Sequence, residues 1–239
     1  MKSSISLDLQ KNLDNHSKVF ETPKVLPPIG DHDHAIHLIP RSVPPNIRPY
    51  RYSYAQKSEI ECMVAEMLEA GIIQPSQSYF YAPVVLVHEK DRSGSMCSDY
   101  RDLKKLTIKY KSPMPVIDKL LDELHGSIYF NKLDLHSKYH QIKMKAEGIL
   151  KTTFRTHEVH YGFLVMPFGL TNAPYTFQDL MNSILKTFLR KFMLVFFYDI
   201  LISSKPWKDH VQHVDRVLKL LEEKQLYEKI SKCFFEVQE

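Results

Sequence analysis

Two apolar segments of this chain each carry an acidic residue where a strand would end or turn, and this pattern constrains the fold most. Residues 130–135 (FNKLDL) and 194–201 (LVFFYDIL) have the aromatic and aliphatic composition of buried strands. A carboxylate beside such strands is costly unless a cation compensates its charge. Oxygen ligands that converge from two strands suit Mg²⁺, which prefers one or two carboxylates together with substrate phosphates. The pattern therefore predicts that Asp134 and Asp199 meet at a magnesium site.

The rest of the chain predicts helices and strands in an irregular order. A capping pattern at Ser58 and Glu61 predicts a helix that ends at Gly71. This order is typical of an α+β fold and not of regular βαβ units. The other predicted elements are a strand over 82–87 with residues 96–103 returning beside it, a helix over 116–124, a strand over 127–135, a hairpin of 151–155 and 159–166, a helix over 172–189 with Pro174 in its first turn, hairpin strands over 191–197 and 200–204, and a helix over 206–226.

The first 54 residues are rich in proline and predict an extended strap, with a short strand over residues 35–39. His32, His34 and His37 stand in this segment beside two aspartates. Both a metal site and a hydrated loop fit that pattern, and we favour the hydrated loop.

The composition of the 239 residues, with 44% hydrophobic and 25% charged, excludes a wholly disordered or collagen-like chain. No apolar run reaches the roughly 18 residues that span a bilayer, and no signal peptide is readable, so we expect no membrane partner. Cys62, Cys97 and Cys233 are dispersed and odd in number, which fits reduced thiols inside the cell, in the cytoplasm or the nucleus. A formal net charge of +4 mildly favours an anionic partner.

Three stretches of the chain, in this order and spacing, resemble the reverse transcriptase domain of gypsy-type LTR retrotransposon polyproteins. They are residues 132–144 (KLDLHSKYHQIKM), 154–178 (FRTHEVHYGFLVMPFGLTNAPYTFQ) and 194–205 (LVFFYDILISSK). Residues 47–61 and 70–78 resemble the segment that leads into the fingers of that family. Several motifs in the correct order make a resemblance far more specific than any single motif does.

The resemblance implies an α+β right-hand polymerase with fingers and a palm, whose small antiparallel sheet is backed by helices. The boundaries would be a leader over residues 1–54, a fingers-like part over 55–125 and a palm over 126–239, with 150–165 returning to the fingers. It implies two-metal phosphoryl transfer, in which a primer 3′-hydroxyl attacks the α-phosphate of a dNTP on an RNA or DNA template. It also leads us to expect that the chain stops before a primer grip and thumb.

Roles for individual residues follow from the same resemblance. Two Mg²⁺ ions would be held by Asp134 and Asp199, with Tyr198 at the degenerate position, where the family has the first of two adjacent aspartates. The ring of Tyr139 would exclude a ribose 2′-hydroxyl. Lys90 is either a phosphate contact or a solvated hairpin charge. The full implied set is Leu135, Tyr139, Phe168, Gly169 and Lys90 at the nucleotide, and Arg101, Pro174 and Phe197 at template or primer.

The chain departs from the family pattern at several positions. Tyr198 replaces the first of two adjacent aspartates, and a neutral phenol with a pKa near 10 is a poor ligand for Mg²⁺. Loss of that ligand predicts a decrease in rate of roughly a thousandfold or more. Gly94 and Ser95 replace a Trp-Arg pair, and Lys138 replaces a turn glycine; substituted turn glycines explain why the chain has only 7 glycines.

These observations predict a retrotransposon reverse transcriptase domain whose catalysis is impaired in this copy. Two alternatives stay open, a non-catalytic nucleic-acid-binding remnant and an element fragment without function. Template–primer, dNTP and other segments of a retroelement polyprotein are the candidate partners.

Overall fold

The fold was analysed in a computed structural model that describes residues 6–23, 25–45, 47–48, 50–88, 94–111, 124–135, 138–196 and 199–238. The chain divides into two compact units, each built from separate segments. The first unit comprises residues 1–23, 112–138 and 177–239, and the second comprises residues 24–111 and 139–176. The division into units does not test the predicted boundaries of leader, fingers and palm, which stay a prediction. No helix of the described residues is long and apolar enough to cross a membrane.

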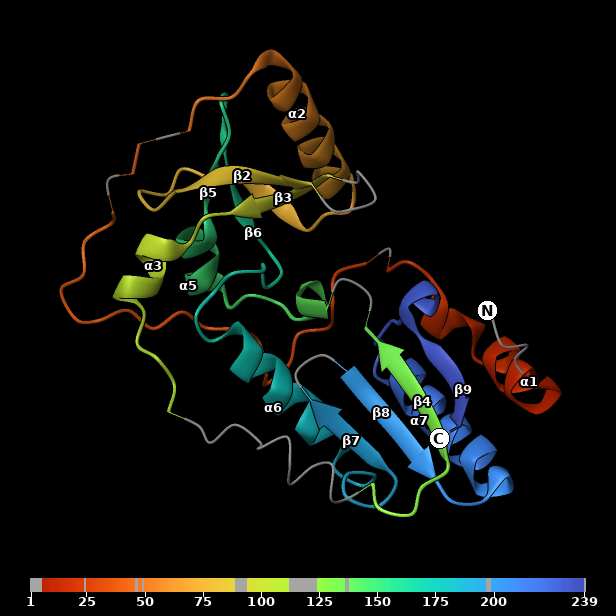
Figure 1. The fold of residues 1–239 in the computed structure, drawn as a ribbon. Helices are drawn as coiled ribbons and strands as arrows, with labels where there is room; N and C mark the ends of the chain where they lie inside the picture. The colour runs from red at the N-terminus through yellow and green to blue at the C-terminus, as the bar shows by residue number, and fades with distance from the viewer. Residues whose placement is uncertain are drawn as a thin grey trace. The chain divides into compact units, whose positions relative to one another are not determined.

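The first unit is built on a four-stranded antiparallel sheet in the order β7-β8-β4-β9 (Figure 1). The two inner strands lie within the predicted segments. Buried residues alternate with half-buried ones over residues 131–134 of β4 and 199–202 of β8, as expected of strands with one covered face. The strands are β4 (Tyr129–Asp134), β7 (Met193–Phe196), β8 (Asp199–Ser204) and β9 (Phe234–Gln238).

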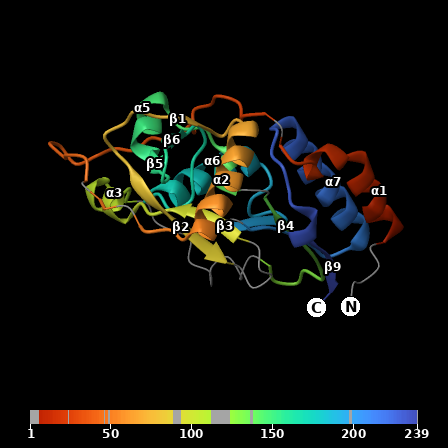
Figure 2. The same cartoon turned by 90° about the horizontal axis from the view of Figure 1, so that it is seen from above.

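Helices cover this sheet through apolar faces spaced at the helical period. Helix α7 (Trp207–Glu223) packs against β8 and β4, and α1 (Leu7–Asn15) packs along α7 (Figure 2). The buried face of α7 repeats every three or four residues, which is the spacing of a helix that covers a core. Helix α6 (Ala173–Leu185) contributes its residues from 177 onward, and the short 3₁₀ helices of this unit are η1 (Ser17–Phe20) and η4 (Ile230–Lys232).

The second unit contains a five-stranded mixed sheet in the order β1-β6-β5-β2-β3. Only the β2–β5 pair of this sheet is parallel. Its strands are β1 (Ile73–Pro75), β2 (Ala82–His88), β3 (Gly94–Ser98), β5 (Phe154–Arg155) and β6 (His160–Phe163). Its helices are α2 (Tyr54–Glu69), α3 (Arg101–Leu106), η2 (Lys138–Gln141), α5 (Ala146–Ile149) and η3 (Leu150–Thr152). The first residue of η2, Lys138, is assigned to the first unit.

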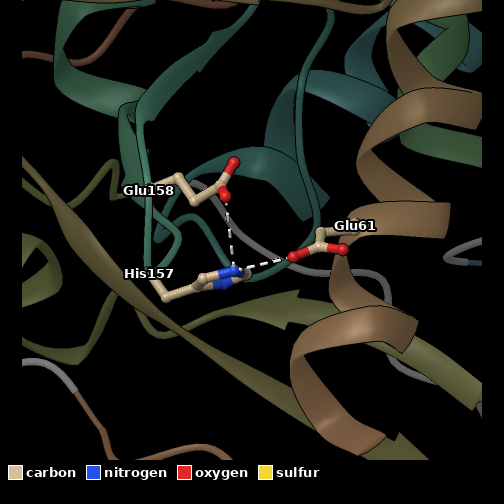
Figure 3. Close-up of side chains that lie close together, drawn as sticks. All are labelled: Glu61, His157 and Glu158. Carbon is tan, nitrogen blue, oxygen red and sulfur yellow. Dashed lines mark hydrogen bonds and ion pairs between the residues drawn. The ribbon is translucent and has the colours of Figure 1, made fainter. Parts of the chain in front are cut away.

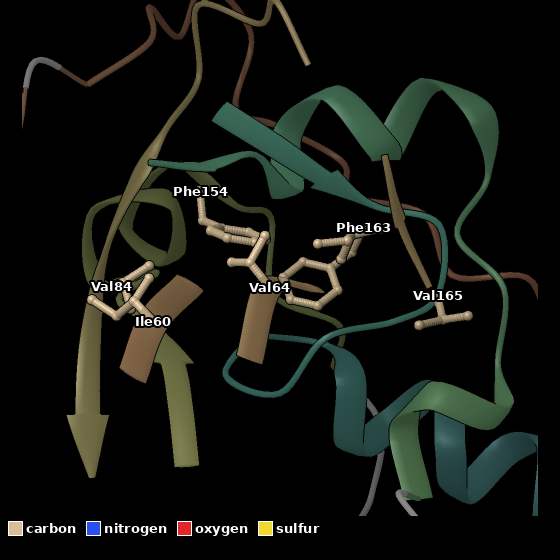
Figure 4. Packing of buried hydrophobic residues seen from close by; sticks show 7 residues of the cluster. Ile60, Val64, Val84, Phe154, Phe163 and Val165 are labelled. Atoms are coloured by element: carbon tan, nitrogen blue, oxygen red, sulfur yellow. The ribbon is translucent and has the colours of Figure 1, made fainter. Parts of the chain in front are cut away.

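The core of the second unit joins α2 to its sheet (Figure 4). Ile60 and Val64 lie one helical turn apart, so both point to the same side of α2. Phe154 is fully buried between this helix and the neighbouring strands, and its ring centroid lies 5.1 Å from that of Phe163. The buried members of this core are Ile60, Val64, Ile73, Val84, Phe154, Phe163 and Val165.

The N-terminal segment differs from the predicted extended strap, because residues 7–15 form α1. Ser6 caps this helix through a hydrogen bond from the Leu9 amide to its hydroxyl. Leu9 and Leu13, spaced four residues apart, are buried. The expectation of an extended strap was based on the prolines, which all lie further along the chain than α1. It therefore overlooked the local helix signal at residues 6–15. The predicted strand over residues 35–39 is also absent from the described elements, where only isolated bridges at His34 and Leu38 occur.

The start of α2 corrects the predicted cap. Ser53, not Ser58, is the N-cap residue, and it forms a capping box with Gln56. The Gln56 side chain accepts a hydrogen bond from the Ser53 amide at 2.9 Å. Glutamine serves at this position as glutamate does, so a search for Ser-x-x-Glu alone placed the helix start too late. Gly71 has a φ of +67° directly after the helix, which confirms the predicted end.

Three further elements differ from the sequence-based expectations. Residues expected to return as a strand after Ser98 instead form α3, and α7 ends at Glu223, before the predicted Leu226. Strand β9 lies beyond the last predicted element and pairs with β4. The hairpin of β5 and β6, the strands β4, β7 and β8, and Pro174 in the first turn of α6 confirm their predictions. Residues 151–152 of the predicted hairpin belong instead to a 3₁₀ helix, and α6 ends at Leu185, before the predicted residue 189. The predicted helix over 116–124 lies almost wholly outside the described residues.

Candidate active site

The two acidic residues singled out in the sequence face each other across adjacent strands. Asp134 is the last residue of β4, Asp199 is the first residue of β8, and they are direct partners in the antiparallel register. Partners in such a ladder carry their side chains on the same face of the sheet. Both residues are half-buried. The arrangement of the two strands is therefore as predicted, while the role of the carboxylates as metal ligands stays a prediction.

Alternation along β4 explains why a charged face can exist beside an apolar one. Leu133 is fully buried, whereas Lys132 and Asp134 on either side of it are half-buried. In β8 the same alternation buries Ile200 and leaves Asp199 at the more accessible face. Successive strand residues point to opposite faces, so Lys132, Asp134 and Asp199 share one face.

Lys132 was missed by the sequence analysis as a residue of this site. Its Nζ lies 2.8 Å from Oδ2 of Asp199. The signal was present, because Lys132 stands two residues before Asp134 in a predicted strand and must lie on the same face. Its ammonium group compensates part of the negative charge that the two aspartates bring together.

A segment near the C-terminus holds the end of β4 in place. The Lys229 amide donates a hydrogen bond of 2.9 Å to the Asp134 carbonyl. Cys233 follows in the same segment, and burial, reinforced by the negative charges of Glu228 and Asp134, raises the pKa of its thiol to about 12. The thiol is therefore protonated near neutral pH and does not compete with the carboxylates for a hard cation.

In the second unit, the structure brings together two aromatic residues predicted to lie at the nucleotide. The ring centroids of Tyr139 and Phe168 are 5.5 Å apart. Tyr139 is only 5% exposed whereas Phe168 is 66% exposed, so Phe168 presents the accessible surface of the pair. Gly169 adopts a φ of +93°, a conformation that side chains rarely allow. That glycine keeps the tight turn that carries Phe168.

Arg101, predicted at template or triphosphate, is held by groups of its own unit. Its guanidinium donates to Oδ2 of Asp99 at 2.7 Å and to the Tyr50 hydroxyl at 3.0 Å. The hydrogen bonds from Arg101, partly opposed by burial, lower the pKa of Asp99 to about 2. The Arg101 side chain is nevertheless 75% exposed and therefore accessible to a phosphate group. In such a contact, Asp99 would still neutralise part of its positive charge.

The other predicted site residues lie in varied surroundings. The side chain of Leu135 is only 1% exposed and can present little more than backbone to a ligand. Pro174 is half-buried in the first turn of α6. Lys90, Phe197 and Tyr198 lie outside the described residues, so their predicted roles carry no structural description.

The histidine-rich segment departs from the expected hydrated loop at His34, whereas His37 is exposed. His34 is 2% exposed, and its Nδ1 lies 2.8 Å from the Thr176 hydroxyl. Burial, reinforced by the positive charge of His37, lowers the pKa of His34 to about 4. Within the described ranges, the group that brings three metal-ligating side chains together lies elsewhere, at Glu61, His157 and Glu158. His34 is thus a packed histidine and not part of a hydrated loop.

Comparison with known proteins places this geometry in a family. The family model described as "Reverse transcriptase (RNA-dependent DNA polymerase)" matches residues 89–239. The chain is 39% identical over 193 residues to the retrovirus-related Pol polyprotein from transposon 297 of Drosophila melanogaster, covering 79% of this chain and 18% of that protein. It is 32% identical over 228 residues to the transposon Tf2-3 polyprotein of Schizosaccharomyces pombe, covering 95% of this chain and 17% of that protein. The chain thus spans less than a fifth of these relatives.

Solved structures show the same fold. The foamy viral protease-reverse transcriptase in complex with RNA/DNA hybrid matches with a TM-score of 0.85 at 20% identity, covering 98% of this chain and 32% of that chain. The same protein in complex with dsDNA matches with a TM-score of 0.84 at 20% identity, covering 99% and 50% of the two chains. The α+β fold therefore corresponds to the fingers and palm region of the foamy viral enzyme.

Proposed function

The chain belongs to the reverse transcriptase (RNA-dependent DNA polymerase) family, as found in LTR retrotransposon polyproteins, and on this premise we propose that it is the fingers and palm part of such a polymerase, in a copy whose catalysis is impaired. The observation that carries the proposal is the pairing of Asp134 with Asp199 across β4 and β8. Because the chain spans less than a fifth of its curated relatives, the activity of a whole polyprotein is part of the proposal.

Asp134 and Asp199 fit the magnesium ions that the family uses. Both offer carboxylate oxygens from neighbouring strands on one face of the sheet, and Mg²⁺ takes such ligands together with phosphate oxygens. The bound metal ions would supply charge stabilisation at the transferring phosphoryl group. Lys132, 2.8 Å from Asp199, offsets part of the repulsion between the two carboxylates when no cation is held.

The second unit supplies the proposed contacts to the nucleotide. Phe168 offers an exposed ring against which a base or sugar can pack, and Tyr139 supports that ring from beneath. The steric exclusion of a ribose 2′-hydroxyl by Tyr139 rests on its match to the family motif. Arg101 is an exposed cation suited to the backbone of a template or to a triphosphate.

Impairment is proposed from the chemistry of position 198. The family pattern has two adjacent aspartates, whereas this chain has Tyr198 followed by Asp199. A tyrosine hydroxyl stays neutral at pH 7 because its ordinary pKa is near 10. It therefore cannot supply the anionic oxygen that a second metal ligand provides. Ser95, in place of the arginine that grips triphosphate in the family, weakens substrate binding further.

Primer extension tests this proposal directly. We compare the chain with its Tyr198→Asp and Tyr198→Phe variants on an oligo(dT)-primed poly(rA) template with dTTP and Mg²⁺ or Mn²⁺. We expect Tyr198→Asp to extend the primer about a thousandfold faster than the unmodified chain, whereas Tyr198→Phe, which removes only the hydroxyl, should bring no gain. Extension by the unmodified chain at the rate of Tyr198→Asp would contradict the proposed impairment.

Nucleic-acid binding without catalysis is the second candidate function. It is favoured by the net charge of +4 and by the RNA/DNA hybrid and dsDNA bound by the structural relatives. Binding to an RNA/DNA hybrid measured between about 50 and 200 mM salt should weaken steeply if phosphate contacts dominate. A salt-dependent affinity combined with no incorporation by either variant at position 198 would favour this candidate over the polymerase.

A further inference from the structure

A second cluster of metal-ligating side chains lies in the second unit, apart from the residues assigned above. Glu61 projects from α2, and His157 and Glu158 project from the turn between β5 and β6 (Figure 3). Nε2 of His157 lies 2.8 Å from Oε1 of Glu61 and 3.9 Å from Oε1 of Glu158. The three ligand atoms all lie within 4.8 Å of one another. We propose that these three side chains form a binding site for a zinc ion.

Both elements that carry the ligands are anchored in the same core. Glu61 follows Ile60, which is fully buried against the sheet. The turn that carries His157 and Glu158 continues from β5, whose Phe154 is buried in that core. The two sides of the cluster are thus tied to one packed body before any ion arrives, which reduces the ordering cost of binding.

The turn itself is held by a local network of hydrogen bonds. The Thr156 hydroxyl accepts hydrogen bonds from the amides of Glu158 and Val159, at 3.2 and 3.0 Å. It also donates to the Val159 carbonyl at 2.9 Å. This network fixes the backbone on both sides of His157, and the side chain of His157 is only 18% exposed. The imidazole is the least exposed of the three side chains, since those of Glu61 and Glu158 are 53% and 67% exposed.

The spacing of the ligand atoms suits a tetrahedral ion with little movement. Ligands bound at about 2.0–2.2 Å in a tetrahedron lie roughly 3.3–3.6 Å from one another. The separations of 2.8 and 3.9 Å from Nε2 of His157 lie on either side of that range, and the two carboxylate oxygens lie within 4.8 Å of each other. Rotation of the exposed glutamate side chains would bring the three atoms to these spacings. A neighbouring cavity of about 190 Å³, lined in part by these residues and by Ala65 and Leu68 of α2, leaves room for a water molecule as fourth ligand.

The donor set selects the kind of ion. One imidazole nitrogen and two carboxylate oxygens suit Zn²⁺, whereas Mg²⁺ prefers oxygen ligands alone. With a neutral imidazole, the cluster carries two negative charges that a divalent ion neutralises. The competing arrangement is a protonated His157 that makes only an ion pair with Glu61, in which a proton takes the place of the metal.

Zinc bound at this position would join parts of the chain that are distant in sequence. Glu61 and His157 are 96 residues apart, on α2 and on the turn between β5 and β6. An ion that binds the folded but not the unfolded chain raises the free energy of unfolding as its concentration rises above its dissociation constant. The site therefore predicts zinc-dependent stabilisation of the second unit.

The experiment titrates untagged, metal-free protein with Zn²⁺ against a competing zinc indicator. An Asp134→Asn/Asp199→Asn background removes the other carboxylate pair. We expect one bound ion, a dissociation constant at least tenfold higher after His157→Asn or Glu61→Gln, and an unfolding midpoint that rises with Zn²⁺ only when the cluster is intact. Two controls should bind as the background does, Cys62→Ser beside the cluster and His125→Asn at an exposed position of the first unit.

Two results would overturn the proposal. One is no zinc binding at up to about 100 μM by folded protein, which leaves His157 and Glu61 as an ion pair only. The other is binding that His157→Asn and Glu61→Gln leave unchanged, or that Cys62→Ser removes, which places the ion elsewhere. Circular dichroism confirms that each variant is folded, and Glu61→Gln retains a side chain of the same size and hydrogen-bonding reach.

Discussion

At the level of single residues, the carboxylates at the end of β4 and the carboxylate of Asp99 differ in what compensates their charge. At the end of β4, Lys132 offsets part of the charge of Asp134 and Asp199 with its ammonium group. At Asp99, the Arg101 guanidinium does the same and lowers the pKa of the carboxyl to about 2. A lysine ammonium on a flexible stem yields its place to an incoming cation more readily than a planar, multiply bonded guanidinium does. We therefore expect an incoming cation to displace Lys132 from Asp199 more readily than it displaces Arg101 from Asp99.

His34 gives a prediction about pH dependence. Its pKa is about 4 in the folded chain and ordinarily near 6.5 in an unfolded one. As the pH falls from about 6.5 to about 4, the unfolded chain takes up a proton that the folded chain refuses, so stability is lost in this window. Relative to His34→Asn, the unmodified chain should lose about 2 kcal/mol of unfolding free energy between pH 7.5 and 4.5, measured by urea denaturation.

The matched control for this prediction is His125→Asn, because His125 is exposed. The free energy of unfolding of the His125→Asn variant should follow that of the unmodified chain at every pH. Parallel pH profiles for the unmodified chain and His34→Asn would show that burial does not hold His34 neutral.

Gly169 gives a prediction about backbone conformation. Its φ of +93° strains any residue that has a Cβ, even though the nearest atom to such a Cβ would be 3.5 Å away. Gly169→Ala should therefore destabilise the chain by about 1–2 kcal/mol. Gly30→Ala is the control, since an added Cβ there meets nothing within 4 Å. Equal thermal midpoints for the two variants would contradict the assigned strain.

At the level of elements, local signals explain most of the helices and strands but not how they pair. The capping box of Ser53 and Gln56 starts α2, and the alternation of buried residues identifies β4 and β8. The partner of β4 on its other side is β9, from the far end of the chain. The sequence of β9 carries no recognisable motif. Its pairing with β4 is therefore identified only from the tertiary structure, where β9 forms the edge strand of the sheet.

The cap of α2 gives a prediction at this scale. Ser53→Ala removes the hydroxyl oxygen that accepts a hydrogen bond from the Gln56 amide, and it should lower the free energy of unfolding by about 1 kcal/mol. Ser58→Ala is the matched control, because Ser58 lies inside the helix, where alanine is favourable. Chemical denaturation of both variants distinguishes the two possible starts of the helix. A larger loss for Ser58→Ala than for Ser53→Ala would restore the start originally predicted from the sequence.

At the level of the whole molecule, the chain forms two compact units whose segments alternate along the sequence. Each unit has its own buried core, which includes Phe154 in the second unit and Phe177 in the first. Cores that melt separately would allow one unit to open while the other stays folded. The order of segments along the chain does not reveal this division into units, because each unit is assembled from segments that are far apart in the sequence.

Hydrogen exchange tests the independence of the two units. Phe154→Ala should cost about 3–5 kcal/mol and speed exchange in residues 24–111 and 139–176, while the β4–β8 amides change little. Phe177→Ala is the reciprocal control and should speed exchange in the first unit instead. Uniform acceleration across the chain by either variant would indicate a single cooperative unit.

The sequence alone was sufficient for the family, the α+β class and the pairing of Asp134 with Asp199, because these depend on short-range alternation and on motifs in a known order. Lys132 was within reach of the same reasoning, from strand periodicity. The tertiary structure decided the parallel β2–β5 pair, the place of β9 and the meeting of Glu61 with His157. Such contacts join segments distant along the chain, and they are selected by the packing of the core within each unit, which no local pattern of residues encodes.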